Sequence, residues 1–109
     1  MESKIFRLVG LARRAGKVSV GTAVVEKMVR RNKVKLLLFA VDASLDTIDK
    51  VLKLQPNCSH IFYGAKHEWG AALGSESFAV LGILEQNFVD GILQQYEVEK
   101  GEGEMGGTI

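Results

Sequence analysis

The sequence lacks the features that most quickly assign a small protein to a class: paired cysteines, long apolar runs and a large net charge. Its single cysteine, Cys58, forms no disulfide within the chain and supplies no Cys-rich zinc framework, which fits a reducing compartment. No apolar run reaches the roughly 20 residues that a transmembrane helix needs. The N-terminal stretch is too charged for a signal peptide. We therefore expect a cytoplasmic protein that does not contact a membrane.

The composition is that of one folded domain with a polar tail. The chain has 109 residues, of which 47% are hydrophobic, enough for one core and little more. From residue 97 onward the sequence reads EVEKGEGEMGGTI, which buries too little apolar surface to order itself. We expect a single α/β/α domain over residues 1–96 and a flexible, acidic, glycine-rich tail over residues 97–109.

The small net charge of +1 hides a strong asymmetry along the chain. Residues 1–35 contain ten basic and two acidic side chains, a balance of +8. The remaining residues contain four basic and eleven acidic side chains, a balance of −7. Such asymmetry indicates a nucleic acid or another anionic surface as partner, although a merely solvated basic face has the same composition.

Helix-type and strand-type apolar patterns alternate along the chain. Helices are expected over residues 4–15, from Gly21-Thr22 to about Asn32, from Leu45 to before Pro56, and over 66–73 and 88–96. Strands are expected over residues 17–20, 35–41, 60–63 and 78–84. The fully apolar strands need helices on both faces, which predicts a three-layer α/β/α sandwich.

Motifs for catalysis or metal binding are absent or accidental. The G-x-G-x-x-G match at residues 101–106 lies in the tail, with no strand before it and no helix expected after it. His67-Glu68 lacks the second histidine of a zinc protease, because Ala71 stands in that position. Cys58 and His60 have no third group to orient them as nucleophile and base. We expect no enzymatic activity, no cofactor and no metal.

The second expected helix presents a basic surface. Its apolar arc, which should face the sheet, consists of Val24, Val25, Met28 and Val29. The opposite arc carries Lys27, Arg30 and Arg31. At the helix start, free N–H groups favour phosphate, Gly21 allows close approach of a backbone, and Thr22 is able to cap the helix. An ordinary solubilising helix face remains the alternative.

Several segments resemble bacterial YlxQ-type proteins of the large-subunit ribosomal protein superfamily that binds kink-turn RNA. They are LVGLARRAGK at residues 8–17, Gly21, Lys27, the strand 35–40, DAS at 42–44 and EWGAALG at 68–74. The resemblance covers about residues 4–92. It implies an α/β/α fold around a four-stranded mixed sheet and a role with RNA, in ribosomes or translation. It also implies contacts from Gly21, Thr22, Lys27 and Arg31 and from the loop Gly74-Ser75-Glu76-Ser77.

The sequence departs from the superfamily at the positions that read bases. Ala23 and Val24 occupy the positions that usually carry hydrogen-bonding side chains, and Ser75 and Ser77 replace apolar loop residues. Losing a bidentate base contact typically removes about 1–3 kcal/mol of discrimination. Recognition of structured RNA by shape and charge is therefore the leading hypothesis. A kink-turn binder that uses backbone groups, and a protein-interaction adaptor with Trp69 as anchor, are the alternatives.

The expected partner is structured RNA, with ribosomal RNA and the ribosome as candidates, and a monomer is expected. The predicted RNA-binding residues are Arg13, Arg14, Lys17, Gly21, Thr22, Lys27, Arg30, Arg31, Gly74 and Ser75.

Overall fold

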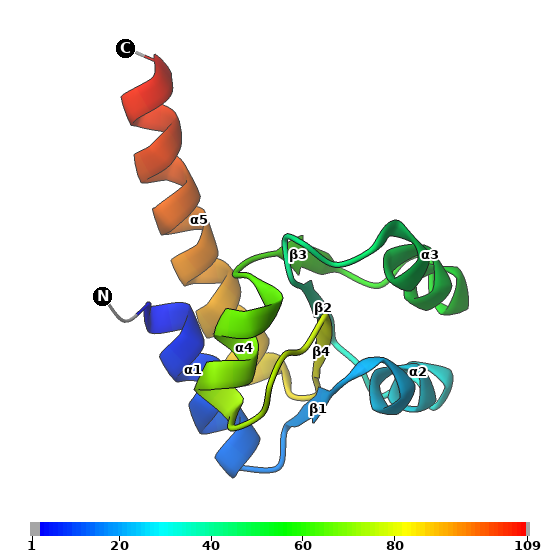
Figure 1. The fold of residues 1–109 in the computed structure, drawn as a ribbon. Helices are drawn as coiled ribbons and strands as arrows, with labels where there is room; N and C mark the ends of the chain where they lie inside the picture. The colour runs from blue at the N-terminus through cyan, green and yellow to red at the C-terminus, as the bar shows by residue number, and fades with distance from the viewer. Residues whose placement is uncertain (1–2, 109) are drawn as a thin grey trace.

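The computed structural model describes residues 3–108, and the side chains of residues 3–100. Helices and strands alternate in the predicted order (Figure 1). The helices are α1 (Lys4–Arg14), α2 (Thr22–Arg30), α3 (Leu45–Leu54), α4 (Lys66–Leu73) and α5 (Gln86–Thr108). The strands are β1 (Val18–Val20), β2 (Leu36–Phe39), β3 (His60–Phe62) and β4 (Val80–Ile83).

The four strands form one mixed sheet in the order β1-β4-β2-β3. β4 is antiparallel to both of its neighbours, whereas β2 and β3 are parallel. Leu81 of β4 stands opposite Val20 of β1 on one side and Leu38 of β2 on the other. The last strand in the sequence is therefore central in the sheet, where its four residues are all buried. The α/β class and the mixed sheet are confirmed.

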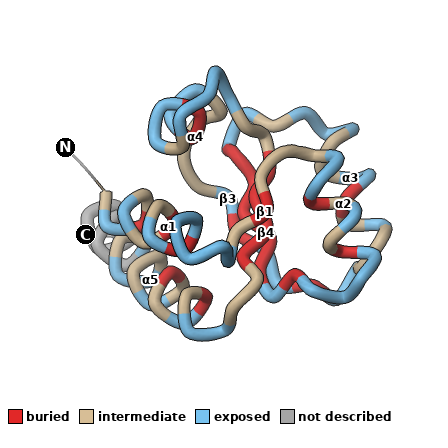
Figure 2. Tube along the Cα trace, turned by 90° about the horizontal axis from the view of Figure 1, so that it is seen from below, coloured by how far each residue is buried: buried red, intermediate tan, exposed pale blue. Residues whose placement is uncertain are grey.

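Helices cover both faces of the sheet and create two cores (Figure 2). One core lies under α1, α4 and α5 and includes Ile5, Leu38 and Ile92. The other lies under α2 and α3 and includes Val25 and Val51. Buried residues concentrate in the sheet and on the inward sides of the helices, which is the pattern expected when a fully apolar strand is covered on both faces.

Trp69 of α4 is the largest fully buried side chain. Its ring lies 4.2 Å from that of Phe6, centroid to centroid, and its Nε1 donates a hydrogen bond of 2.6 Å to the carbonyl of Tyr63. Because no part of the side chain reaches solvent, the hypothesis that Trp69 anchors a partner protein is wrong. Its indole N–H has its partner inside the fold.

Local signals place the ends of most elements. Ser44 caps α3 by accepting a hydrogen bond from the Thr47 amide, and Ser3 caps α1 by accepting one from Ile5. The left-handed Gly74, with φ of 81°, ends α4. Gly16 follows the end of α1 with φ of 74°, the left-handed conformation in which a glycine commonly ends a helix.

The last helix differs from the expectation. It begins at Gln86 and continues to Thr108, whereas residues 88–96 were expected to be helical. Its backbone thus crosses the stretch expected to be a flexible tail, and that flexibility remains a prediction. Helix growth adds one hydrogen bond per residue once a helix is nucleated, and the packed turns around Val89 and Ile92 supply that nucleus.

Tyr63 ties the beginning of the chain to α5. Its hydroxyl donates a hydrogen bond of 2.6 Å to Oε1 of Glu99, and Ser3 Oγ lies 2.6 Å from the phenol oxygen. Gln95 donates to the other carboxylate oxygen of Glu99 at 3.0 Å. Burial, and next the hydrogen bond to Glu99, raise the pKa of Tyr63 above its ordinary value of 10.0.

This raised pKa predicts a loss of stability at high pH. Below the ordinary value the phenol is protonated in both states, so its full contribution is present. Above that value the unfolded chain loses the proton first, and folding stability declines until the folded pKa is passed. Urea unfolding followed by circular dichroism between about pH 9 and pH 11 should therefore show a steeper decline for the wild type than for Tyr63→Phe. Parallel declines would contradict this assignment.

None of the helices over residues 3–108 combines the length and the apolar character that crossing a membrane would require.

Candidate nucleic-acid interface

The first turn of α2 has no side-chain cap. Gly21 occupies the N-cap position with φ of 89° and ψ of 150°, a conformation that favours glycine. Thr22 is already the first helical residue, so the expectation that it caps the helix is wrong. Because the first amides of a helix have no partner within it, this turn offers N–H groups suited to an anion.

The outward side of this first turn is also different from the prediction. Val25 and Val29 are buried, as expected, but Val24 is 50% exposed and Ala23 is exposed as well. The assignment of Val24 to the sheet-facing arc was wrong. In this helix of 9 residues the buried stripe is narrow and consists of Val25 and Val29, which lie one turn apart. Val24 therefore faces solvent at the position where the superfamily resemblance places a base contact.

The loop between α4 and β4 is held against α4 by backbone hydrogen bonds. The Ser75 amide donates to the Gly70 carbonyl at 2.8 Å, and the Phe78 amide donates to the Lys66 carbonyl at 3.1 Å. A Cβ atom on Gly70 would stand 2.3 Å from the Glu76 carbonyl oxygen. Gly70 thus lets the loop cross α4 in direct backbone contact, with Ser75 and Ser77 exposed.

The start of α2 and the end of this loop meet at one end of β4. The Gly21 amide donates to the Val80 carbonyl at 3.1 Å, and the Ala40 amide donates to the Ala79 carbonyl at 2.9 Å. At the other end of the loop, Nη1 of Arg13 donates to the Leu73 carbonyl at 3.2 Å. The structure therefore brings together Gly21 and the loop, and Arg13 and the beginning of the same loop.

Most of the predicted cations lie away from that junction. The Leu84 amide donates to the Lys17 carbonyl and the Lys35 amide to the Ile83 carbonyl, so both lysines flank the far end of β4. Arg30 ends α2, and it lies about 12 Å along the helix from Thr22. Of the predicted residues, Gly21 and Thr22 lie at the junction, whereas Gly74 and Ser75 lie at the beginning of the loop, next to the contact with Arg13. Arg14 follows Arg13 at the end of α1, and Lys27 lies in the last turn of α2. Lys17, at the far end of β4, and Arg30 and Arg31, at the end of α2, are called the basic end below.

Two lysines at the basic end were not among the predicted contacts. Lys33 and Lys35 are exposed between α2 and β2. Both had been counted in the positive balance of residues 1–35. What the sequence did not provide was the strand order, which places Lys35 across β4 from Lys17.

The positive field of these side chains is largely not neutralised within the fold. Lys17 lies 4.0 Å from the carboxylate of Glu85, a partly exposed pair that contributes little. Among the described side chains, Arg14, Lys27, Arg30 and Arg31 make no ion pair. An extended anion would therefore meet cations that are available for contact, spread over α2 and the end of α1.

The structure gives no support to chemistry at Cys58. The thiol is buried, and desolvation raises its pKa, so it remains protonated. The ring of His60 approaches the Cys58 carbonyl, at 3.4 Å from Nδ1. Within the described part of the chain, no group of three metal-ligating side chains is suitably placed.

No protein-family model matches the chain. It is 33% identical over 91 residues to the RNA-binding protein YlxQ of Bacillus subtilis, a match that spans 81% of this chain and 90% of that protein. A protein of unknown function from Bacillus halodurans has the same fold, with a TM-score of 0.79, 27% identity and coverage of 86% and 97%. The 15.5 kD RNA-binding protein of Giardia lamblia matches with a TM-score of 0.66, 25% identity and coverage of 90% and 92%. These findings confirm the resemblance seen in the sequence: the chain belongs to the YlxQ family.

Proposed function

We propose that this protein is a non-catalytic RNA-binding protein that contacts structured RNA through α2 and the loop after α4. The observation that carries the proposal is the first turn of α2, which has no side-chain cap and is fixed to β4 beside an exposed loop. The cations that follow it form no ion pair with any side chain that the structure describes. A relative in sequence, from Bacillus subtilis, and a protein of the same fold, from Giardia lamblia, are both named RNA-binding proteins, which supports the same interpretation.

Shape and charge are the means of recognition that the side chains favour. Ala23 and Val24 are exposed at the positions to which the family resemblance assigns base contacts, and neither side chain donates or accepts a hydrogen bond. Phosphate contacts position a protein on RNA without reading its sequence. Base-specific contact, where it occurs, falls to the backbone N–H groups of the first turn of α2.

The test is a titration of a labelled kink-turn RNA and a straight duplex of equal length at two salt concentrations. We expect both RNAs to bind, with affinities that fall steeply as salt increases, because each phosphate contact releases counterions. A strong preference for the kink-turn would instead favour the alternative in which backbone groups read the motif. Failure of both RNAs to bind would contradict the proposal.

A double variant tests the contribution of the basic face of α2. Lys27→Ala with Arg31→Ala should weaken binding to both RNAs and reduce the slope of log affinity against log salt by about 2. The matched control is Lys50→Ala with Lys53→Ala, which removes two exposed lysines from α3. Equal salt slopes in the two double variants would remove the basic face of α2 from the interface.

Ribosomal RNA is the structured RNA that the family resemblance favours, and the proposal extends to association with the ribosome in the cytoplasm. Comigration with ribosomal subunits in a sucrose gradient, lost in the Lys27→Ala and Arg31→Ala double variant, is the expected result.

A further inference from the structure

We propose that the outer face of α1 is a docking surface for an acidic, amphipathic helix of a partner protein. This face, called the α1 ridge below, consists of Lys4, Arg7, Leu11 and Arg14. All four side chains are exposed, including half of Leu11. The opposite side of α1 is fully buried in the core through Ile5, Val9 and Ala12.

The spacing of the α1 ridge suits the packing of a second helix. Its residues follow one another at intervals of three, four and three, which places them within an arc of about 80°. This is the spacing by which one helix contacts another along a shared seam. From Lys4 to Arg14 the ridge extends about 15 Å, which is the length of three helical turns.

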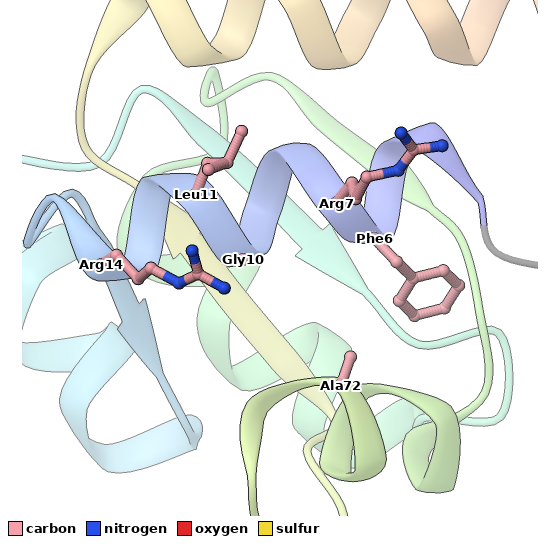
Figure 3. A pocket seen from close by; sticks show the side chains of 6 residues that line it. All are labelled: Phe6, Arg7, Gly10, Leu11, Arg14 and Ala72. Carbon is pink, nitrogen blue, oxygen red and sulfur yellow. The ribbon is translucent and has the colours of Figure 1, made fainter.

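Two hollows flank the α1 ridge. One, of about 300 Å³, lies between α1 and α4 and is lined by Phe6, Arg7, Gly10, Leu11, Arg14 and Ala72 (Figure 3). The guanidinium of Arg14 lies over this gap, and Ala72 points toward α1 from α4. The other hollow, of about 240 Å³, is lined by Lys4, Arg7, Leu8 and Leu11. The ridge therefore has space on both sides into which side chains of another molecule fit.

Gly10 is the feature that the fold itself does not explain. A glycine inside a helix is destabilising because of its backbone entropy, and it is usually kept where a neighbour approaches closely. A Cβ atom built on Gly10 meets no atom within 4 Å, and its φ is not positive. No described contact within the chain needs this glycine. The space that Gly10 leaves beside Leu11 is open to solvent. It forms a notch in the surface of α1 that a side chain of another molecule can enter.

The positive charge of α1 indicates that its partner is acidic. The helix carries four basic residues and no carboxylate, and Lys4 and Arg14 make no ion pair with any described side chain. Carboxylates of a partner would therefore complement the ridge. Leu11, Gly10 and Ala72 offer apolar contact rather than hydrogen bonds, which suits leucine-like side chains better than a phosphate backbone. An acidic helix with an apolar stripe satisfies both requirements.

The test uses three labelled helical peptides of about 18 residues. The first carries leucines at helical spacing between glutamates, the second replaces its glutamates with lysines, and the third replaces its leucines with serines. Binding to the full chain is measured by fluorescence anisotropy. We expect the first peptide to bind at least about tenfold more tightly than the other two.

The variants are chosen outside the RNA interface, because Arg14 belongs to both surfaces. Gly10→Gln fills the notch, and Leu11→Ala removes the apolar contact; each should weaken the first peptide about tenfold or more. Leu45→Ala, at an exposed leucine on α3, is the matched control and should leave peptide binding unchanged. Because glutamine is a better helix former than glycine, the melting temperature of Gly10→Gln should stay the same or rise.

Several results would overturn the proposal. Equal affinity for the three peptides would do so, as would normal peptide binding by Gly10→Gln. A lowered melting temperature of that variant would show that Gly10 serves the fold. If Gly10→Gln weakened RNA binding but not peptide binding, the α1 ridge would be part of the RNA-binding surface instead. Sedimentation equilibrium tests a further outcome. If the wild type formed a concentration-dependent dimer and Gly10→Gln did not, a second copy of this chain would be shown to cover the α1 ridge.

Discussion

Trp69→Ala is expected to lower the free energy of unfolding by about 3–5 kcal/mol. The side chain is completely buried in the core under α1, α4 and α5, where its ring packs on Phe6. Its removal leaves a cavity between these helices and deprives the Tyr63 carbonyl of its indole donor, 2.6 Å away. A small domain has little stability in reserve, so this variant is expected to be largely unfolded at elevated temperature.

The measurement is guanidinium unfolding followed by far-UV circular dichroism, because Trp69 is the only tryptophan and its fluorescence is lost in the variant. Leu45→Ala is the control, since that side chain is 77% exposed and its truncation should change stability by less than about 0.5 kcal/mol. A loss for Trp69→Ala no larger than that of the control would contradict the role of Trp69 in the core.

Gly70→Ala should destabilise the protein by about 1–3 kcal/mol and displace the loop before β4. The added methyl group would stand 2.3 Å from the Glu76 carbonyl oxygen and 2.6 Å from the Ser77 amide nitrogen. Both neighbours are backbone atoms, so the loop as a whole has to move. We expect the hydrogen bonds that the Ser75 and Phe78 amides donate to α4 to weaken.

Gly10→Ala provides a matched control with the opposite sign. Both glycines are helical, but the new methyl group at Gly10 meets nothing within 4 Å, so this variant should gain up to about 1 kcal/mol from helix propensity. Amide hydrogen exchange should be faster at Ser75 and Phe78 in Gly70→Ala only. Unchanged stability together with unchanged exchange at these amides would show that the loop does not depend on Gly70.

Most of the fold could be predicted from local patterns. The fully apolar strands around Leu36–Phe39 and Val80–Ile83 required cover on both faces, and the structure provides it. The structure also has residues at helix ends that are typical of them in any sequence: Ser44 caps α3, and the left-handed Gly16 and Gly74 follow α1 and α4. The exposure of Val24 could not be predicted, because helical periodicity gives the direction of the buried stripe of a helix but not its width.

The candidate interface was only partly visible in the sequence. The cations could be counted, but their separation into a junction and a basic end depends on β4 lying between β1 and β2. Nothing in the spacing of Gly21 and Val80 indicates that their backbones are hydrogen-bonded. Gly10 and Gly70 look alike in the sequence, and only the surroundings of each Cβ position distinguish a surface notch from a backbone crossing.

The central position of β4 has a consequence for synthesis of the protein. β1 ends at Val20 but pairs with a strand that begins 60 residues later, at Val80, and β2 also needs β4 as its antiparallel neighbour. While the chain is emerging during translation, β1 therefore has no strand to pair with. The edges of β1 and β2 that pair with β4 in the finished sheet have no hydrogen-bonding partner until β4 has been made. Closure of the sheet has to await the final third of the chain, so folding is expected to be nearly all-or-none and late. Nascent chains that stop before β4 are consequently expected to be substrates for chaperones or proteases.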